Sequence, residues 1–504
     1  MPSDNAQPDL LLGVDAGQTV TKACVFDRYG REVGSGSARV GVTSAAPHWV
    51  ERDMEEVWQA SAAAIKSALA AVDVAGRDPA SRIAAVGIVG HNDGLYLVDQ
   101  AGAPVRAAVT AMDTRAGDIL AEWRASSMWS RALALTGQVP YAGSPSTLLA
   151  WFARHDAAVL DRARWVLFCK DWLRLRLTGE VATDPTEASA AFTSVRTQQY
   201  ADEALALYGL DALAEKLPPL VASHAVAGEV GPVGSEATGL PCGTPVVTGA
   251  HDVDGTAIGV GAVTPGMLSL AAGTFSINQV VSRHAVVDER WQARSFVLPG
   301  QWLTMSTSPS SATNLEWWRE VFGLDADDAS YDRLGREAAA ALDGPSQLLY
   351  HPFLYGSPYG EVASAAVLGL RGWHSRGDLV RAVLEGVVLG HRVHVDALRE
   401  RFELSGTARL AGGAARSAVW SQMFADALDL EVEVPDGDEA GARGAALLAG
   451  LGTGWYASLE DAAATVSIAR RHVPDPARRT VLDAAYDRFV EAATSLRELW
   501  PRLG

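Results

Sequence analysis

One arrangement, a strand followed by a small-residue turn and a second strand, occurs twice in this chain. Alternating apolar and β-branched residues predict the strands. We place them at 10–14 and 19–26 in the first copy and at 267–270 and 275–281 in the second. The turns between them are residues 15–18 (Asp-Ala-Gly-Gln) and 271–274 (Ala-Ala-Gly-Thr). This repeat predicts two related halves with a cleft between them.

Helices alternate with strands through much of the chain, which predicts an α/β fold with mixed strand directions. Residues 54–69 predict a helix capped by Asp53. Residues 83–89 predict a buried strand, and 95–98 its hairpin partner. Further helices are expected at 376–399, 417–428, 459–466 and 482–496.

The length of 504 residues is too great for one hydrophobic core and sufficient for two or three domains. A Pro- and Gly-rich stretch at 228–245 separates the two halves. We therefore expect an N-terminal domain over 1–247 and a C-terminal domain over 248–504.

The charge balance narrows the classes of partner. A net charge of −18 argues against binding to nucleic acid or to an anionic membrane surface, because both require basic surface. An acidic protein can still bind ATP through local backbone N–H groups, a few cations and a metal ion. The oligomeric state stays open, with a homodimer as one option.

The sequence also predicts a cytoplasmic protein. Its three cysteines, Cys24, Cys169 and Cys242, lie far apart and lack the spacing of metal ligands, so we expect them to be reduced thiols. The polar N-terminus has neither the basic nor the apolar region of a signal peptide. No uncharged apolar run reaches the roughly 18 residues of a membrane-spanning helix.

The first turn has the chemistry of a phosphate-binding site. Gly17 lets the backbone approach a phosphate, and Thr19 and Lys22 offer a hydroxyl and a cation. Asp15 is a candidate to hold Mg²⁺ through water, since Mg²⁺ takes few protein ligands. A plain hairpin turn explains the same residues equally well.

Two further glycine turns fit a nucleotide. Gly273 lets the backbone approach a phosphate closely, and Thr274 offers a hydroxyl group, as Gly17 and Thr19 do in the first turn. Gly412, Gly413 and Ala414 precede a predicted helix, where small residues leave room for a nucleoside and the helix N-terminus favours anions. A tight strand turn and an ordinary helix start are the alternatives.

Asp252 is the candidate catalytic residue. It follows the apolar run 245–247 and stands among small residues, where a substrate hydroxyl group can approach it. As a general base it would accept the proton of an attacking hydroxyl group during phosphoryl transfer. The alternative is a helix cap. Asp254 fits a cap equally well, and His251 is interpreted as structural because no second histidine lies at metal spacing.

Together these segments resemble the FGGY family of carbohydrate kinases over nearly the whole chain. The matching segments are 15–22, 49–53 (Trp-Val-Glu-Arg-Asp), 170–173 (Lys-Asp-Trp-Leu) with 177–179 and 183–184, Asp252, 365–385 and 410–426. The resemblance implies two actin-like (ribonuclease-H-like) ATPase domains with ATP and sugar in the cleft between them. It also implies phosphorylation of a terminal hydroxyl group with ATP and Mg²⁺, the sugar against domain 1–247 and ATP on domain 248–504. Gln18 departs from the family, which has Thr there.

The loop 90–94 (Gly-His-Asn-Asp-Gly) bears on the substrate. D-xylulose kinases have a histidine where this chain has Asp93, and the loop resembles that of erythritol kinases. Segments 308–317 and 352–357 instead resemble L-xylulose kinases. Asn92 and Asp93 are predicted to form hydrogen bonds with sugar hydroxyl groups. The same is predicted for Asp113, which lies in an Asp-x-Arg motif.

Each of these assignments has an alternative. Asp93 also fits a hairpin turn before Gly94, and Asp113 a buried ion pair with Arg115. The predicted substrate is a small ketose, most simply a pentulose such as xylulose, with a polyol such as erythritol or another tetritol as the alternative. A non-catalytic sugar sensor and an actin-like filament or chaperone module are the rival classes.

Overall fold

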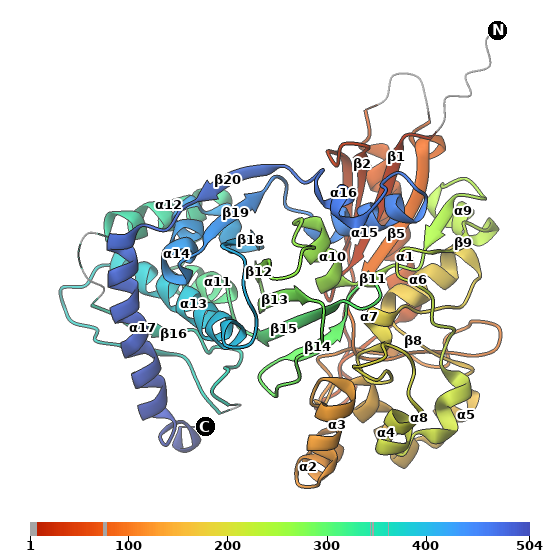
Figure 1. The fold of residues 1–504 in the computed structure, drawn as a ribbon, viewed down its shortest axis with the longest axis horizontal. Coiled ribbons are helices and arrows are strands. Elements are labelled where there is room, and N and C mark those ends of the chain that lie inside the picture. The colour runs from red at the N-terminus through yellow and green to blue at the C-terminus, as the bar shows by residue number, and fades with distance from the viewer. Residues whose placement is uncertain (1–7, 74–77, 343, 345–346, 361, 504) are drawn as a thin grey trace. The chain divides into compact units, whose positions relative to one another are not determined.

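The computed structural model describes residues 8–73, 78–342, 344, 347–360 and 362–503. The chain forms two compact α/β units (Figure 1). The first comprises Met1–Val263, Val281–Thr304 and Glu439–Val466, and the second comprises Thr264–Val280, Met305–Asp438 and Ser467–Gly504. The chain therefore passes between the units several times. A single domain boundary at residue 247 stays a prediction for the family domains.

A mixed sheet forms the centre of the first unit. Its strands follow the order β3-β2-β1-β5-β10-β9, and β11 also pairs with β5. Their bounds are β1 (Leu10–Ala16), β2 (Val20–Asp27), β3 (Glu32–Arg39), β5 (Ile83–Gly90), β9 (Val226–Glu229), β10 (Pro245–Val247) and β11 (Ala250–His251). Strand β1 is antiparallel to β2 and parallel to β5, and β10 is parallel to β5 and antiparallel to β9.

Helix α1 (Met54–Ala70) covers one side of this sheet. The carboxylate of Asp53 caps it by accepting hydrogen bonds from the backbone N–H groups of Glu55 and Glu56, at 2.7 and 3.2 Å. Apolar side chains at helical spacing, including Trp58 and Ile65, are buried in the core with the sheet. The predicted helix and its predicted cap are both confirmed.

Helix α15 (Ala440–Gly452) packs directly against β1 and β5. A Cβ atom on Gly13 or Gly87 would lie 1.8 or 1.9 Å from a backbone oxygen of this helix. Only glycine permits so close an approach. These two glycines thereby bring the N-terminus of α15 close to the end of β1.

The first unit has a second core built from short helices around Phe152 and Leu149. Its remaining elements are β4 (Glu51–Arg52), β6 (Tyr96–Val98), β7 (Ala108–Val109), α2 (Gly117–Arg124), α3 (Met128–Thr136), α4 (Pro145–His155), α5 (Ala157–Arg162), β8 (Trp165–Leu167), α6 (Cys169–Thr178), α7 (Pro185–Ala188), α8 (Asp202–Tyr208), α9 (Pro232–Thr238), α10 (Asp252–Gly259), β14 (Gln292–Ser295), α16 (Leu459–Ala463) and the 3₁₀ turns Pro79–Arg82 and Asp211–Lys216.

The predicted hairpin of 83–89 with 95–98 is wrong. Strand β6 pairs with β8, not with β5. Strand β5 is already flanked by β1 on one side and by β10 and β11 on the other, so neither of its edges is free for a hairpin partner. The chain does turn at Asp93 and Gly94, whose φ angles are 64° and 75°, but it leaves the sheet there.

The second unit repeats the same topology with the strand order β15-β13-β12-β18-β19-β20. Strand β12 is antiparallel to β13 and parallel to β18, and β19 is parallel to β18 and antiparallel to β20. The bounds are β12 (Leu268–Ala272), β13 (Ser276–Ser282), β15 (Trp302–Ser308), β18 (Thr407–Ala411), β19 (Glu431–Pro435) and β20 (Ile468–His472). The predicted repeat is therefore confirmed in each unit.

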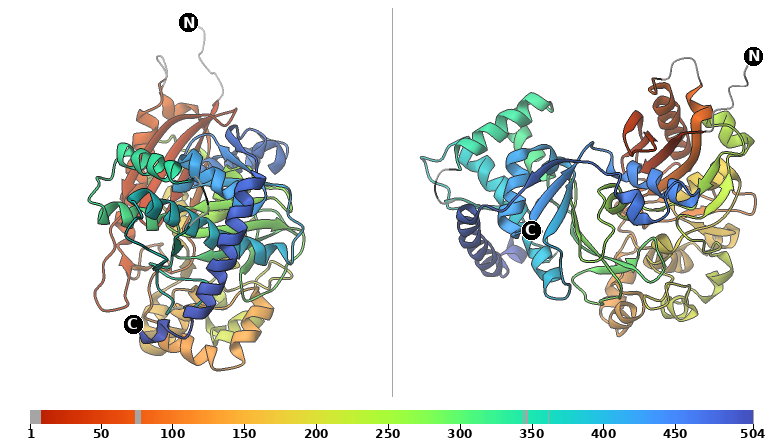
Figure 2. Two further views of the ribbon diagram at one scale, coloured as in Figure 1. Left: turned by 90° about the vertical axis from the view of Figure 1, so that its left-hand side faces the viewer. Right: turned by 45° about the horizontal axis from the view of Figure 1, so that its top comes forward.

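Helices surround this second sheet. The helices are α11 (Thr313–Val321), α12 (Asp328–Ala340), α13 (Arg376–Arg399), α14 (Ala418–Leu428) and α17 (Pro476–Leu496). The unit also contains the 3₁₀ turns Gly413–Arg416 and Trp500–Arg502 and the short strands β16 (Leu349–His351) and β17 (Ala366–Leu368). Figure 2 shows α17, in dark blue, along the outside of the second unit. Among the described residues, no helix is long and apolar enough to cross a membrane.

Candidate active site

Asp15 and Asp252 lie at neighbouring strand ends of the first unit. Asp15 is the second-last residue of β1 and lies opposite Lys22 and Val89 in the two adjacent strands. Asp252 begins α10 directly after β11, which pairs with the end of β5. Burial, and then the nearby Asp252 carboxylate, raise the pKa of Asp15 to about 7. Two carboxyl groups that repel each other in this way fit a site that a cation would stabilise.

The N-terminus of α15 faces the same carboxyl group. A Cβ atom on Gly441 would lie 2.1 Å from Oδ2 of Asp15, so the helix backbone touches the carboxyl group directly. The positive end of the helix dipole favours an anion there. Beside it, Nζ of Lys22 lies 2.7 Å from the Glu439 carboxylate, so this predicted phosphate ligand already has an ion-pair partner.

The predicted phosphate turn is a tight hairpin between β1 and β2. The backbone N–H of Gly17 donates to the carbonyl of Val20 at 3.2 Å, and Arg52 donates to the carbonyl of Gly17 at 3.4 Å. Thr19 is exposed, whereas Oε1 of Gln18 is buried without a hydrogen-bond partner among the described residues. The hairpin geometry is thus present, and phosphate binding stays a prediction.

Beyond β5, the loop 91–94 is buried. Asp93 accepts two hydrogen bonds from Nη2 of Arg294, at 3.1 and 3.2 Å. Arg294 lies on β14 and also donates through Nε to Oε1 of Gln138 at 3.0 Å. Asn92 donates to the carbonyl of Thr186 at 3.5 Å and accepts a hydrogen bond from the N–H of Asp93. Asp93 is therefore one half of a buried ion pair.

Sequence reasoning did not find Arg294, because nothing in the surrounding residues of β14 marks it and its partner is 201 positions away. It also did not find Glu187 on α7, whose side chain is fully buried. The only sequence signal for Glu187 was its place three residues after Asp184, in a motif where Asp184 itself caps the helix.

A buried ionic network holds α7 in place. Lys170 lies 3.0 Å from Oδ1 of Asp184 and 2.7 Å from Oδ1 of Asp171. The backbone N–H of His251 donates to Oγ1 of Thr186 at 2.9 Å. This bond connects α7 to the residue before Asp252. The Lys-Asp and Thr-Asp segments seen in the sequence therefore position the site.

The carboxyl group of Asp252 lies beside the imidazole ring of His251. Its Oδ1 atom lies 3.1 Å from Nε2 of His251, and about a quarter of its side chain, 28%, is exposed. The carboxyl group is thus both oriented by the imidazole ring and accessible. This supports the interpretation of His251 as a structural residue.

Asp113 is fully buried. Its carboxylate accepts hydrogen bonds from the backbone of Val50 at 2.7 Å and from the guanidinium of Arg115 at 2.7 and 2.9 Å. Arg115 also pairs with Glu51. This geometry favours the buried ion pair over direct contact with a sugar.

In the second unit, the turns after β12 and β18 lie side by side. Gly412 has a φ of 86°, and a Cβ atom there would lie 2.7 Å from the backbone of Ala272. Gly273 accepts a hydrogen bond from the N–H of Ala312 at 2.8 Å, and Thr274 follows it. Gly413 and Ala414 open a 3₁₀ turn, and Ser417 then caps α14. Gly412 and Gly413 are exposed, whereas Ala414 is buried. The two predicted glycine turns thus lie against each other.

No group of three or more His, Cys, Asp or Glu side chains in the described part of the chain is arranged to hold a metal ion. A single protein ligand, Asp15, is compatible with Mg²⁺, because Mg²⁺ usually retains several waters. The three cysteines are free thiols, with Cys24 and Cys169 buried.

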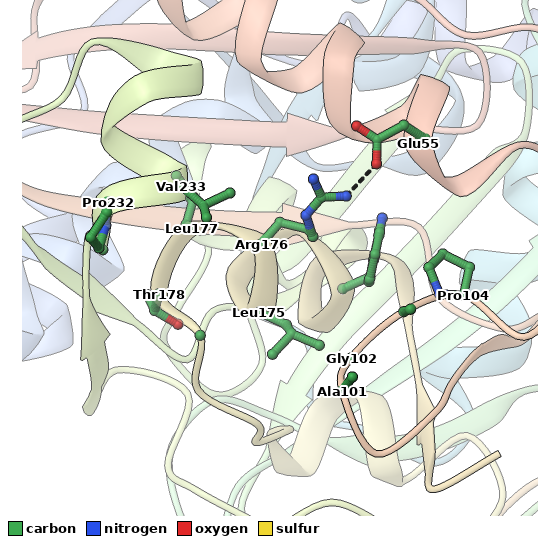
Figure 3. A pocket seen from close by; sticks show the side chains of 14 residues that line it. Glu55, Ala101, Gly102, Pro104, Leu175, Arg176, Leu177, Thr178, Pro232 and Val233 are labelled. Atoms are coloured by element: carbon green, nitrogen blue, oxygen red, sulfur yellow. Dashed lines mark hydrogen bonds and ion pairs between the residues drawn. The ribbon is translucent and has the colours of Figure 1, made fainter.

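A separate hollow of the first unit, about 470 Å³ in volume, is shown in Figure 3. Arg176 points across it and forms an ion pair with Glu55, and apolar side chains such as Leu175 and Val233 line much of the rest. Among the described residues, its lining includes none of the predicted site residues. It is therefore distinct from the candidate active site.

Comparison with known proteins gives a consistent result. Residues 10–259 match the model of the N-terminal domain of the FGGY family of carbohydrate kinases, and 268–453 match that of its C-terminal domain. The chain is 32% identical over 501 residues to L-xylulose/3-keto-L-gulonate kinase of Escherichia coli, covering 98% of each chain. It is 30% identical over 524 residues to erythritol kinase of Brucella abortus, again covering 98% of each. The crystal structure of xylulose kinase from Rhodospirillum rubrum superposes with a TM-score of 0.87 at 28% identity, covering 97% of this chain and 99% of that one.

Proposed function

The chain belongs to the FGGY family of carbohydrate kinases, and we propose that it transfers the terminal phosphoryl group of ATP to a terminal hydroxyl group of a small ketose, a pentulose such as xylulose. The observation that carries this proposal is the pair of carboxyl groups, Asp15 and Asp252, at adjacent strand ends beside a buried polar loop.

In this proposal Asp252 is the general base. Its carboxylate accepts the proton of the substrate hydroxyl group, whose oxygen forms a bond to the terminal phosphorus as the bond to the bridging oxygen of ADP breaks. His251, 3.1 Å away, orients the carboxylate for this transfer. The partial exposure of Asp252 lets a substrate reach it.

The nucleotide is assigned to the glycine turns. Gly17, Thr19, Lys22, Gly273 and Thr274 are proposed to bind phosphates through backbone N–H groups, hydroxyl groups and a cation. Small residues border the nucleoside, namely Gly412, Gly413 and Ala414.

Asp15 would hold Mg²⁺, which when bound neutralises charge on the transferring phosphates. The mutual repulsion of Asp15 and Asp252 supports this assignment, because a cation would relieve it.

Asn92 and Asp93 are proposed to face the sugar, and Asp113 to support them from its buried ion pair with Arg115. Relatives named L-xylulose kinase, at 31% and 32% identity over nearly the whole chain, favour a pentulose. The erythritol kinase at 30% identity keeps a tetritol as the second candidate.

A coupled assay of ADP release tests the proposal across L-xylulose, D-xylulose, ribulose, erythrulose and erythritol with Mg²⁺ and ATP. The expected result is a kcat/KM for one xylulose enantiomer at least 10-fold above that for erythritol. Preference for erythritol would replace the pentulose by the polyol. Binding of a sugar without any ADP release would instead indicate a non-catalytic sensor.

A further inference from the structure

The one-turn helix α7 is connected to three parts of the candidate site. Thr186 accepts a hydrogen bond from the backbone of His251 at 2.9 Å, next to the proposed base. The carbonyl of Thr186 accepts one from Asn92 at 3.5 Å. Ser189 accepts one from the backbone of Ser295 at 3.2 Å, next to Arg294. Helix α7 therefore stands between the base, the sugar loop and β14.

Glu187 lies on this helix with its side chain fully buried. Neither oxygen of its carboxyl group has a hydrogen-bond partner in the part of the chain that the structure describes. A buried polar group without a partner costs free energy, so such groups in a native protein call for an explanation. A ligand that supplies the missing hydrogen bonds is one such explanation.

Arg294 and Asp254 show the same feature. The guanidinium of Arg294 is 2% exposed and donates to Asp93 and Gln138, yet Nη1 is buried and has no partner among the described residues. Oδ1 of Asp254, on α10, is likewise buried and unpartnered there. Arg294 interacts electrostatically with both Glu187 and Asp254. Unpartnered acceptors and an unpartnered donor therefore lie within electrostatic range of one another.

Carboxyl groups dominate this neighbourhood. Glu187, Asp254 and Arg294 interact electrostatically with the carboxyl groups of Asp93, Asp171, Asp184 and Asp252. Three of the buried cations nearby, Arg294, Lys170 and Arg174, already pair with Asp93, Asp171 and Asp184. Burial raises the pKa of Glu187 and Asp254 well above the usual range, so each can donate as well as accept a hydrogen bond. Because Arg294, Lys170 and Arg174 each already pair with a carboxylate, a negatively charged substrate would find no uncompensated positive charge among them.

Building on the proposed function, we infer that Glu187 and Nη1 of Arg294 bind hydroxyl or carbonyl oxygens of the acceptor, and that the site selects an uncharged polyhydroxy chain against a sugar acid. The E. coli relative is named for both kinds of substrate, L-xylulose and 3-keto-L-gulonate. This chain is inferred to favour the first kind, because the buried cations here are already neutralised and a further buried carboxylate is strongly disfavoured.

Calorimetric binding and ADP release test this with the full chain, using L-xylulose and D-xylulose against 3-keto-L-gulonate. The preferred xylulose is expected to bind, and to be turned over in kcat/KM, at least 100-fold better than the sugar acid. Equal or better binding of the acid would overturn the inference. If no acceptor were turned over, the proposed function would fail, while the binding comparison would still decide this inference.

Variants at Glu187 test the contact itself. Glu187→Ala should raise KM for the ketose about 100-fold while KM for ATP stays unchanged, and Glu187→Gln, which retains a donor and an acceptor, should recover most of the loss. Glu236→Gln, an exposed carboxyl group on α9, is the matched control and should match the wild type. An unchanged KM in Glu187→Ala, with thermal stability retained, would remove Glu187 from the site. If Glu187→Ala failed to fold, the Glu187→Gln variant would decide the question. Arg294→Met removes the other proposed sugar contact and serves as the reference for a full loss of sugar binding. An equally large loss in Glu187→Gln would show that Glu187 does not act as an uncharged hydrogen-bond donor to the sugar.

Discussion

The two units share one strand topology but differ in the side chains at its central hairpin. In the first unit, β1 and β2 place Asp15 opposite Lys22, one position before the turn. In the second, β12 and β13 place Ala271 opposite Ile277 at the corresponding position. The backbone pairing is the same in both, antiparallel to the next strand and parallel to a later one.

The two units also differ in their buried polar groups. Those of the first unit are largely ionic, as in the network of Lys170 with Asp171 and Asp184. The second unit also buries an ion pair, Arg381 with Glu385, but its His391 shares hydrogen bonds with Asn278 at 2.7 Å and Ser311 at 3.0 Å. A repeated fold therefore supplies two similar frames, and a few substitutions place the proposed base in one and the glycine turns proposed for the nucleotide in the other.

The largest expected effect comes from removing the proposed base. Asp252→Asn should lower kcat about 1,000-fold, because proton transfer by a positioned side chain contributes 10²–10⁴-fold. ATP binding should change little, since the nucleotide is assigned to glycine turns. Steady-state kinetics with calorimetry measure both, with the exposed Asp202→Asn as control. Near-normal turnover would show that the first unit does not supply the base.

Replacing one close-contact glycine in each unit sharpens the comparison. Gly441→Ala would drive a Cβ atom into Asp15, and Gly412→Ala would strain a positive φ and press on Ala272. Overpacking of this kind costs about 1–3 kcal/mol. We expect Gly441→Ala to lower kcat about 10- to 100-fold and Gly412→Ala to raise KM for ATP by a similar factor.

Gly406→Ala is the control for both glycine variants, because a Cβ atom there meets no neighbour within 4 Å. Identical kinetic changes in the Gly441 and Gly412 variants would contradict a division of labour between the units.

Acid should affect the two units differently. Burial lowers the pKa of His391 to about 3 and that of His394 to about 4, against 6.5 in the unfolded chain. The unfolded state then binds more protons below pH 6.5, so each histidine removes about 2 kcal/mol of stability between pH 7 and pH 5. In the first unit, burial likewise lowers the pKa of His91 to about 4, but it raises the pKa of Asp15 to about 7 and that of Glu187 well above its usual range. The folded state therefore gains protons at these carboxyl groups between pH 7 and pH 5, which offsets the cost of the buried His91.

Hydrogen exchange at pH 5 and 7 distinguishes the two units. Peptides of β12 and β18 should lose protection at pH 5, and His391→Gln should remove about half of that loss. Peptides of β1 and β5 should show no parallel loss, and a uniform response of both sheets would rule out this explanation.

The smallest effect is expected at Lys22. Its ion pair with Glu439 is partly exposed, with side chains 39% and 23% accessible, and such pairs contribute about 0–1 kcal/mol. Lys22→Met should therefore leave the free energy of unfolding in urea nearly unchanged. The KM for ATP tests whether Lys22 also binds phosphate. A several-fold rise in Lys22→Met would support phosphate binding, and an unchanged KM would remove Lys22 from the proposed phosphate ligands.

The sequence by itself determined the local elements and the family. Apolar periodicity located the two hairpins and the helix at 54–69, and Asp53 caps that helix as predicted, because these features depend on neighbours a few residues away. The tetrapeptide turns and the isolated Asp252 also stand out in the sequence, since small residues beside a polar one are unusual after an apolar run.

Only the tertiary structure decided how distant residues pair. Strand β6 joined β8 because both edges of β5 were occupied, a fact that belongs to the sheet and not to residues 95–98. Arg294 meets Asp93 across 201 positions, and Glu187 lacks a partner because of what surrounds α7. Periodicity reports which face of an element is buried, whereas charge pairing and unmet hydrogen bonds arise only once several elements meet.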